Sequence, residues 1–247
     1  MENKVVFITG SAKRLGAYTA NYLHNLGYRV VLHCHNSVDQ VKALSTQLNE
    51  KRIDSVKWVQ GDLCDLQQLN QIAESAIASF GRIDVLINNA SAFYPTPLTT
   101  FTLTDWQALI GSNAQAPLFL IQKLQKQLIQ NQGVVINMVD IHAQRPLSGH
   151  TIYCMAKAAL VTLTQSLAQE LAPNVRVNGV APGAILWPDT ALPENEKSAI
   201  LSQIPLGRLG NEKDISEAIA FLISASYITG QIVAVDGGRS IANPSVA

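Results

Sequence analysis

The sequence has no net charge, few cysteines and no apolar run of membrane-spanning length. Its 18 basic and 18 acidic side chains cancel, so nothing attracts a polyanion and we expect no nucleic-acid partner. The cysteines, Cys34, Cys64 and Cys154, are three in number and lie far apart, which favours neither a disulfide framework nor a metal centre. The charged start lacks a signal-peptide pattern. These absences predict a cytoplasmic protein with no membrane segment.

Short apolar runs rich in valine and isoleucine alternate with longer amphipathic stretches along the 247 residues. We expect strands at residues 4–9, 29–34, 55–60, 83–89, 133–139, 175–181 and 231–236, with helices between them. This alternation is typical of a parallel sheet covered on both faces, because each crossover between parallel strands carries a helix. The right-handed crossover rule then predicts an α/β fold, a doubly wound Rossmann-type sheet of about seven strands in one domain spanning residues 1–247.

The sequence contains no repeat, low-complexity segment or linker-like stretch. The long irregular candidate is APGAILWPDTALPENEK, residues 181–197, whose three prolines predict a loop or lid after the sixth strand. We expect a substrate loop around residues 183–205. Ligands of doubly wound sheets bind at the carboxyl ends of the strands, so the residues that follow each strand are the candidates for function.

The first strand is followed by TGSAKRLG, residues 9–16, which opens a helix. Gly10 permits a tight turn, Gly16 permits close packing, and the helix N-terminus offers unpaired N–H groups to a diphosphate. An ordinary strand-to-helix turn also uses glycine, so both interpretations stay open at this point. Arg14 stands where a dinucleotide fingerprint has its second glycine, and its side chain must point out of the turn.

The second strand ends in HCHNS, residues 33–37, without the acid that an NAD-binding protein places on the ribose hydroxyls. Lys13, Asn36 and Ser37 are suited to hold a 2′-phosphate instead, which predicts NADPH as the cofactor. Ser37 also fits the N-cap of a capping box that ends at Gln40, and the two roles are compatible.

We expect His33 and His35, near the end of the second strand, to point to opposite faces and not to form a metal pair.

The stretch MVDIHAQRPLSGHTIYCMAK, residues 138–157, pairs a tyrosine with a lysine one helical turn later. Tyr153 and Lys157 together suggest a proton donor beside a cation. Asp140, thirteen residues before the tyrosine, is a carboxylate that makes the tyrosine harder to ionise. Its alternative role is to cap a helix or loop at the end of the fifth strand.

These features, with GDL (61–63), NNAS (88–91), SNAQAP (112–117), NGVAPG (178–183) and YITGQIVAVDGG (227–238), resemble the short-chain dehydrogenase/reductase family over essentially the whole chain. The resemblance implies that Tyr153 donates a proton, that Lys157 lowers the tyrosine pKa and holds the nicotinamide ribose, and that Asn113 maintains a helix kink and a water. It also implies that Asp62 lies at the adenine.

Three departures from the common family pattern resemble the pteridine reductase branch. Arg14 replaces a glycine, Asp140 replaces a serine, and NNASAFYPTPL, residues 88–98, carries Phe93. In that branch the aromatic residue stacks on a flat pterin, and the carboxylate suits proton delivery to nitrogen, whereas it would repel the oxyanion formed from a ketone. The alternative for Phe93 is a core aromatic. Trp187 stands where many members have a threonine, and it either walls the substrate pocket or anchors a loop.

The leading hypothesis is an NADPH-dependent pteridine reductase acting on a dihydropterin or dihydrofolate. A carbonyl or 3-oxoacyl thioester reductase and a non-catalytic NADP-binding regulator are the alternatives. We also expect a homotetramer, because a helix over residues 151–172 has only Lys157 and Glu170 as charges. The predicted site comprises catalytic Asp140, Tyr153, Lys157 and Asn113; cofactor-binding Gly10, Lys13, Arg14, Leu15, His35, Asn36, Ser37, Asp62, Leu63, Asn89, Ala90, Ser91, Met138, Lys157, Pro182 and Gly183; and substrate-binding Arg14, Ser91, Phe93, Asp140, Tyr153 and Trp187.

Overall fold

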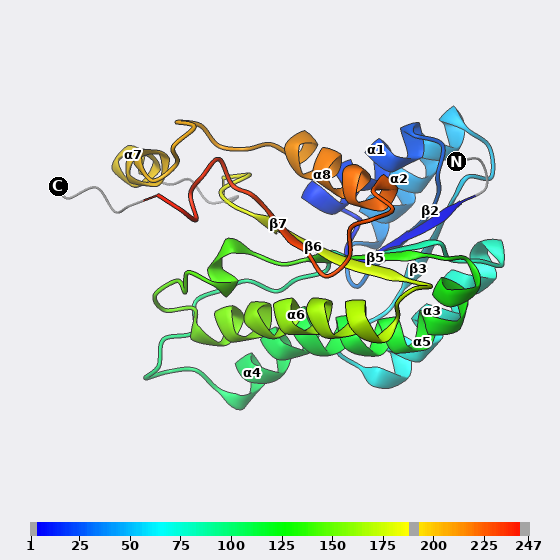
Figure 1. Cartoon of the computed structure of the whole chain (residues 1–247), viewed down its shortest axis with the longest axis horizontal. Helices are drawn as coiled ribbons and strands as arrows, with labels where there is room; N and C mark the ends of the chain where they lie inside the picture. Colours follow the sequence, from blue (N-terminus) through cyan, green and yellow to red (C-terminus); the bar gives the residue numbers. More distant parts are fainter. Residues whose placement is uncertain (1–3, 188–192, 243–247) are drawn as a thin grey trace.

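The computed structural model describes residues 4–187 and 193–242, and within them seven parallel strands form one sheet (Figure 1). The order across the sheet is β3-β2-β1-β4-β5-β6-β7. The predicted doubly wound sheet is therefore confirmed. The strands are β1 (Val5–Ile8), β2 (Arg29–Cys34), β3 (Val56–Gln60), β4 (Val85–Asn88), β5 (Val134–Met138), β6 (Arg176–Pro182) and β7 (Ile232–Val235).

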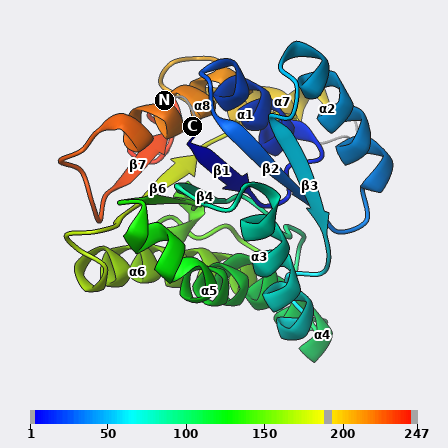
Figure 2. The same cartoon turned by 90° about the vertical axis from the view of Figure 1, so that its right-hand side faces the viewer.

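Helices cover both faces of the sheet (Figures 1 and 2). On one face lie α1 (Arg14–Asn25), α2 (Val38–Lys51) and α8 (Glu212–Ser224); on the other lie α3 (Leu66–Phe80), α5 (Ala116–Gln130) and α6 (Thr151–Glu170). The remaining elements are α4 (Leu103–Ile110), a π-helical turn η1 (Gly111–Gln115), a 3₁₀ turn η2 (Ile141–Ala143) and α7 (Glu194–Ser202). No described helix is long and apolar enough to cross a membrane.

The central strand β1 shows how the sequence supports a sheet that is buried on both faces. Val6 and Ile8 belong to the hydrophobic cluster under α1, α2 and α8, whereas Val5 and Phe7 belong to the cluster under α3 and α5. All four side chains are fully buried. Because side chains alternate between the two faces of a strand, a continuous apolar run fills both cores. This is why polar and apolar residues do not alternate along the buried strands.

The strand order reverses at β1, which pairs with β2 on one side and with β4 on the other. The connections from these strands leave in opposite directions, and a crevice opens at their carboxyl ends. The segments after β1 and β4 meet there. The sheet therefore brings the predicted glycine turn next to the NNAS segment, although about a third of the chain separates them.

Two expectations about the bounds of elements differ from the structure. Helix α7 begins at Glu194, inside the expected loop, because Pro193 precedes it and Glu194 and Glu196 suit the first helical turn. Residues 188–192 of that loop lie outside the described residues. Helix α6 ends at Glu170 rather than at residue 172, since the residue before Pro173 disfavours helical geometry.

Ser37 is the N-cap of α2, but its side chain makes no capping hydrogen bond, so the expected capping box with Gln40 is wrong. The reason is the backbone of Ser37, whose ψ of 56° lies outside the extended region that aims an N-cap oxygen at the first turn. Asp39 lies in the first turn of α2, where its charge suits the helix dipole.

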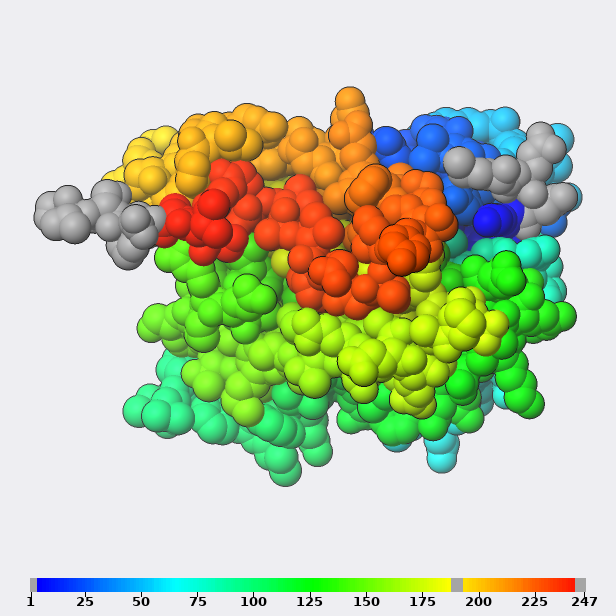
Figure 3. Space-filling view, viewed as in Figure 1, coloured from blue at the N-terminus to red at the C-terminus, as the bar shows by residue number. Residues whose placement is uncertain are grey.

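The segment after β7 lies between α7 and residues 140–150 (red beside green in Figure 3). Arg145 holds it there, because its Nη1 donates to the carbonyl of Arg239 at 2.6 Å and to that of Ala242 at 3.2 Å. Arg239 in turn donates to Gln203, just after α7, at 3.3 Å. The C-terminal turn therefore joins the loop after β5 to α7.

Candidate active site

The turn after β1 needs glycine at two positions. Gly10 has a φ of +59°, and a Cβ atom there would lie 2.8 Å from the Cα of Ala90. A Cβ atom on Gly16 would lie 2.5 Å from the carbonyl oxygen of Gly10. Asn89 closes the turn, because its Nδ2 donates to the carbonyls of Thr9 and Gly10, each at 2.9 Å. The chain segments after β1 and β4 therefore approach each other so closely that a side chain at Gly10 or Gly16 would not fit.

The N-terminus of α1 faces a cavity of about 1090 Å³ that Gly10, Lys13, Arg14 and Leu15 help to line. Lys13 holds the N-cap position without a side-chain capping hydrogen bond. The first helical turn therefore retains N–H groups and a partial positive charge for an anion. This arrangement fits the diphosphate of the dinucleotide that the sequence predicts.

Arg14, the first residue of α1, has a φ of 49°, a left-handed conformation that favours glycine. Its side chain points out of the turn, and Nη2 donates to the carbonyl oxygen of Trp187 at 3.3 Å. The two residues are 173 positions apart in the sequence. The fold thus brings together two of the predicted substrate-binding residues.

His33 is a residue of the site that the sequence interpretation missed. Its side chain is buried at the end of β2, Nδ1 accepts a hydrogen bond from the Gly10 N–H at 3.1 Å, and Nε2 lies 3.1 Å from the Gly61 carbonyl oxygen. These partners require the tautomer with hydrogen on Nε2. Burial lowers the pKa of His33 to about 4, so the ring stays neutral and both bonds persist at neutral pH. His35 follows the end of β2 and is exposed, but it lines the same cavity as His33. The expectation that the two histidines point to opposite faces is therefore wrong, because residues two positions apart along a strand share a face.

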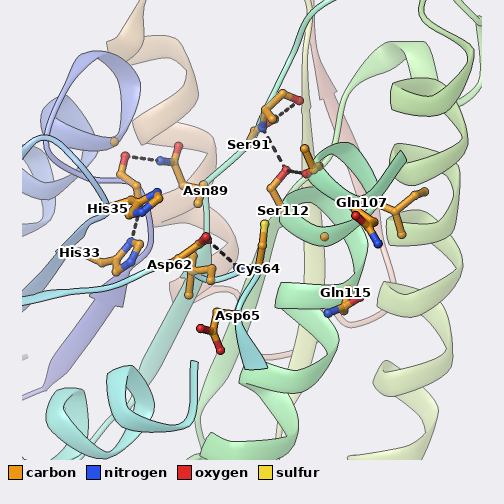
Figure 4. A pocket seen from close by; sticks show the side chains of 18 of the residues that line it. His33, His35, Asp62, Cys64, Asp65, Asn89, Ser91, Gln107, Ser112 and Gln115 are labelled. Atoms are coloured by element: carbon orange, nitrogen blue, oxygen red, sulfur yellow. Dashed lines mark hydrogen bonds between the residues drawn. The ribbon is translucent and has the colours of Figure 1, made fainter. Parts of the chain in front are cut away.

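The cavity collects predicted cofactor residues from four strand ends (Figure 4). Several of its other lining residues were not predicted, among them Cys64, Trp106, Gln107 and Gln115. The thiol of Cys64 stays protonated, because burial and the neighbouring Asp62 raise its pKa to about 11. The predicted cofactor residues on the lining are Gly10, Lys13, Arg14, Leu15, His35, Asp62, Leu63, Asn89, Ala90 and Ser91.

The other predicted cofactor residues, Asn36, Ser37, Met138, Lys157, Pro182 and Gly183, do not line this cavity. Asn36 and Ser37 directly follow His35 at its edge. Pro182 is the last residue of β6, and a Cβ atom on Gly183 would lie 2.6 Å from the Cβ of Asp236, so glycine there permits the close approach of the segment after β7.

Asn113 lies in the π-helical turn η1, which joins α4 to α5. Its Nδ2 donates to the carbonyl of Leu109 at 3.0 Å and to that of Ala92 at 2.9 Å, and its Oδ1 accepts from the hydroxyl of Ser91 at 2.7 Å. A side chain that bonds to the carbonyl four residues earlier competes with the helical backbone, and the π-helical turn η1 lies here. Asn113 thereby ties the helix to the segment after β4.

Asp140, Tyr153 and Lys157 converge from β5 and α6. The hydroxyl of Tyr153 donates to Oδ2 of Asp140 at 2.7 Å, and Nζ of Lys157 donates to the Met138 carbonyl at 2.7 Å. Oδ1 of Asp140 accepts from the backbone N–H of His142 at 2.8 Å and so caps η2. The two alternatives for this aspartate, a cap and a partner of the tyrosine, are therefore both present.

The electrostatics of this cluster keep the tyrosine protonated. Burial raises the pKa of Tyr153 far above its usual value, and the charge of Asp140 and the hydrogen bond to it raise it further. Burial lowers the pKa of Lys157 to about 8, an effect that the Asp140 charge partly offsets. The phenol is thus a proton donor at neutral pH, and the lysine is close to its titration point.

Phe93 lies beside the same cluster and not in the core, so the core alternative is wrong. Its side chain is 56% exposed. Its ring meets Tyr153 edge-on at 4.8 Å between centroids and stacks on His150, which the sequence interpretation did not single out. An exposed ring beside a buried phenol offers a stacking surface to a flat ligand.

Comparison with known proteins assigns the family. A family model described as enoyl-(acyl carrier protein) reductase matches residues 10–240. Among curated proteins, pteridine reductase 1 of Leishmania tarentolae is 37% identical, and the match covers 96% of this chain and 96% of that protein. The chain belongs to the short-chain dehydrogenase/reductase family. It is therefore an oxidoreductase by family.

Other members of the short-chain dehydrogenase/reductase family are nearly as similar. The 3-oxoacyl-[acyl-carrier-protein] reductase of Staphylococcus epidermidis is 33% identical, with 96% of this chain and 98% of that protein covered. The protein of the same name from Thermotoga maritima is also 33% identical, with 98% and 99% covered. The names of these relatives thus give two different activities, so the family does not determine the substrate of this chain.

Proposed function

We propose that this chain is an NADPH-dependent pteridine reductase that reduces a C=N bond of a dihydropterin or dihydrofolate. The observation that carries the proposal is the 2.7 Å hydrogen bond between the Tyr153 hydroxyl and Asp140. A carboxylate at this place would repel the oxyanion that forms when a ketone is reduced, whereas a C=N bond needs a proton delivered to nitrogen.

The side chains of the cluster have complementary tasks in this reaction. Tyr153 holds a proton on Oη, because its raised pKa keeps the phenol neutral. Asp140 orients that hydroxyl toward the substrate nitrogen and relays a replacement proton from water after transfer. Lys157 holds the nicotinamide ribose, and Phe93 stacks on the pterin ring. When bound, NADPH supplies the hydride.

The choice of NADPH rests on the end of β2, where no acidic side chain stands to repel a 2′-phosphate. Lys13 supplies a positive charge from the adjacent turn, and Asn36 and Ser37 supply hydrogen-bonding groups. Arg14 follows Lys13 and donates to the Trp187 carbonyl. In the proposed complex Lys13 contacts the phosphorylated dinucleotide, and Arg14 contacts the polar substrate.

A second candidate is a carbonyl or 3-oxoacyl thioester reductase. The 33% identity to 3-oxoacyl-[acyl-carrier-protein] reductases favours it. Asp140 weighs against it, because the carboxylate would repel the oxyanion formed from a ketone. A non-catalytic NADP-binding regulator is disfavoured, since such a protein has no use for a buried proton donor.

The test is to follow NADPH oxidation with dihydrobiopterin, dihydromonapterin, dihydrofolate, a β-ketoacyl thioester and a series of simple ketones. We expect catalytic efficiency, kcat/KM, to be highest with a dihydropterin or dihydrofolate. Faster reduction of the ketones or the thioester would instead support the second candidate. NADPH binding without turnover of any of these compounds would leave the regulator as the better description.

A further inference from the structure

The orientation of Phe93 depends on its two aromatic neighbours. It comes from an irregular segment after β4 and is 56% exposed, so the core does not fix its ring. The ring stacks on His150 with centroids 4.8 Å apart and an interplanar angle of 14°. It meets the ring of Tyr153 at the same centroid distance and an angle of 74°. One face of Phe93 is therefore backed by the imidazole.

His150 is held by both its backbone and its ring. It is the N-cap residue of α6, and its carbonyl accepts from the Cys154 N–H at 2.9 Å. Its Nδ1 lies 2.9 Å from the carbonyl oxygen of Ser148. Since a carbonyl only accepts, Nδ1 carries the hydrogen. A residue held by its backbone and by one ring nitrogen can support a neighbouring ring that the core leaves unsupported.

The three rings form a continuous wall at the start of α6. His150 and Tyr153 are three residues apart, so their side chains lie on one side of the helix. Phe93 touches both rings. A flat molecule on the open face of Phe93 would thus lie close to Tyr153, whose hydroxyl is the predicted proton donor.

We propose that His150 is a positioning residue for the substrate, which backs Phe93 so that its other face receives a flat heteroaromatic ring beside Tyr153. The inference rests on the proposed function, because a pterin offers such a ring and an aliphatic 3-oxoacyl chain does not. His150 acts through Phe93 and takes no part in proton transfer, since the Tyr153 hydroxyl donates to Asp140.

Two substitutions separate the ring of His150 from its polarity. His150→Phe keeps a flat ring without its nitrogens, whereas His150→Gln keeps a polar side chain without a ring. With a dihydropterin and saturating NADPH, we expect His150→Gln to raise KM by roughly two- to tenfold, the effect of one aromatic pair. We expect kcat to stay within about twofold and His150→Phe to keep a near-native KM.

A double-mutant cycle tests whether the effect passes through Phe93. His150→Gln should add little to the KM of Phe93→Ala, because the ring that it supports is already gone. In the background of Phe221→Ala, which removes an equally exposed phenylalanine on α8 (56%), it should have its full effect. Additive effects with Phe93→Ala would overturn the inference.

Other outcomes are equally decisive. A native KM in folded His150→Gln, a tenfold rise in KM in His150→Phe with an unchanged Tm, or a fall in kcat with unchanged KM would each contradict a positioning role. If the unaltered enzyme reduces neither a dihydropterin nor dihydrofolate, the proposed function and this inference fail together. If it reduces one of them with a KM that substitution of His150 leaves unchanged, this inference alone fails.

Discussion

The Tyr153 hydroxyl and the Asp140 carboxylate are joined by a hydrogen bond of 2.7 Å, and the second oxygen of the carboxylate is held by the His142 N–H at 2.8 Å. Both oxygens of Asp140 are engaged, so the carboxylate cannot rotate without losing a partner. The phenol and the carboxylate therefore have a fixed mutual geometry before any substrate arrives.

Removal of either partner should impair the same step. We expect Asp140→Asn, which removes the charge but keeps the shape, and Tyr153→Phe, which removes the proton, each to lower kcat with a dihydropterin by roughly a hundredfold or more. The double variant should cost little beyond the worse single variant, because the two groups act as one unit. Steady-state kinetics of the three variants provide the measurement. Multiplicative losses would show that the two groups act independently.

Asp140→Ser should change the preferred substrate. A hydroxyl at this place can stabilise a developing oxyanion, which the carboxylate repels, so the ratio of kcat/KM for ketones to that for dihydropterins should rise. Competition between the two substrates in one reaction measures this ratio directly. If Asp140→Ser and Asp140→Asn have the same ratio as the unaltered enzyme, the aspartate serves only as the cap of η2.

The preference for NADPH over NADH should narrow in Lys13→Ala. One charge-assisted contact to the 2′-phosphate contributes on the order of 1.5 to 3 kcal/mol, which is about tenfold or more in affinity. Dissociation constants of both cofactors, measured by fluorescence, give the comparison. Lys57→Ala is the matched control, because it removes a lysine paired with Asp54 outside the cavity. Equal affinities of the unaltered enzyme for the two cofactors would refute the assignment.

NADPH binding should weaken with rising pH above about 8. Burial lowers the pKa of Lys157 to about 8, so the ammonium form prevails below this value and is lost above it. If the ammonium holds the nicotinamide ribose, the dissociation constant of NADPH should rise through this range. Lys157→Met should bind more weakly throughout and show no such rise. The same pH dependence in Lys157→Met would assign the effect to another group.

We propose a homotetramer in solution. Helix α6 has a partly exposed surface with Lys157 and Glu170 as its two charges, and Lys157 is buried. A long helix with so little exposed charge is typical of a surface that packs on another subunit. Light scattering at micromolar concentration gives the mass, and a monomer there would contradict the proposal.

The sequence predicted the elements of this fold because the signals are local. Val5 to Ile8 form an unbroken apolar strand, and the glycines at positions 10 and 16 mark the turn that follows. Tyr153 and Lys157 lie on one helix, so their spacing alone brought them together. Helix α7 was missed because three prolines nearby favoured a loop, although the acidic first turn after Pro193 was a helix-start signal.

The contacts that the sequence did not predict join distant elements. His33 bonds to the turn after β1 and to the end of β3, and no pattern within one strand reports such a bridge. The stacking of Phe93 on His150 and the Arg14 bond to Trp187 depend on where loops meet. The turn at Ser37 adopts a backbone geometry that its capping sequence did not reveal.

The pairing of β1 with β4 has a consequence for folding order. The Val5 N–H donates to the carboxylate of Asp84, 79 positions later, and the Asn89 side chain donates to the Gly10 carbonyl across the same separation. Contacts between distant positions form late, because a long loop must close before they contribute. The turn after β1 is thus packed on both sides only after the segment following β4 has been synthesised. A nascent chain that ends before Ala90 contains the glycine turn but not the segment after β4 that packs against it.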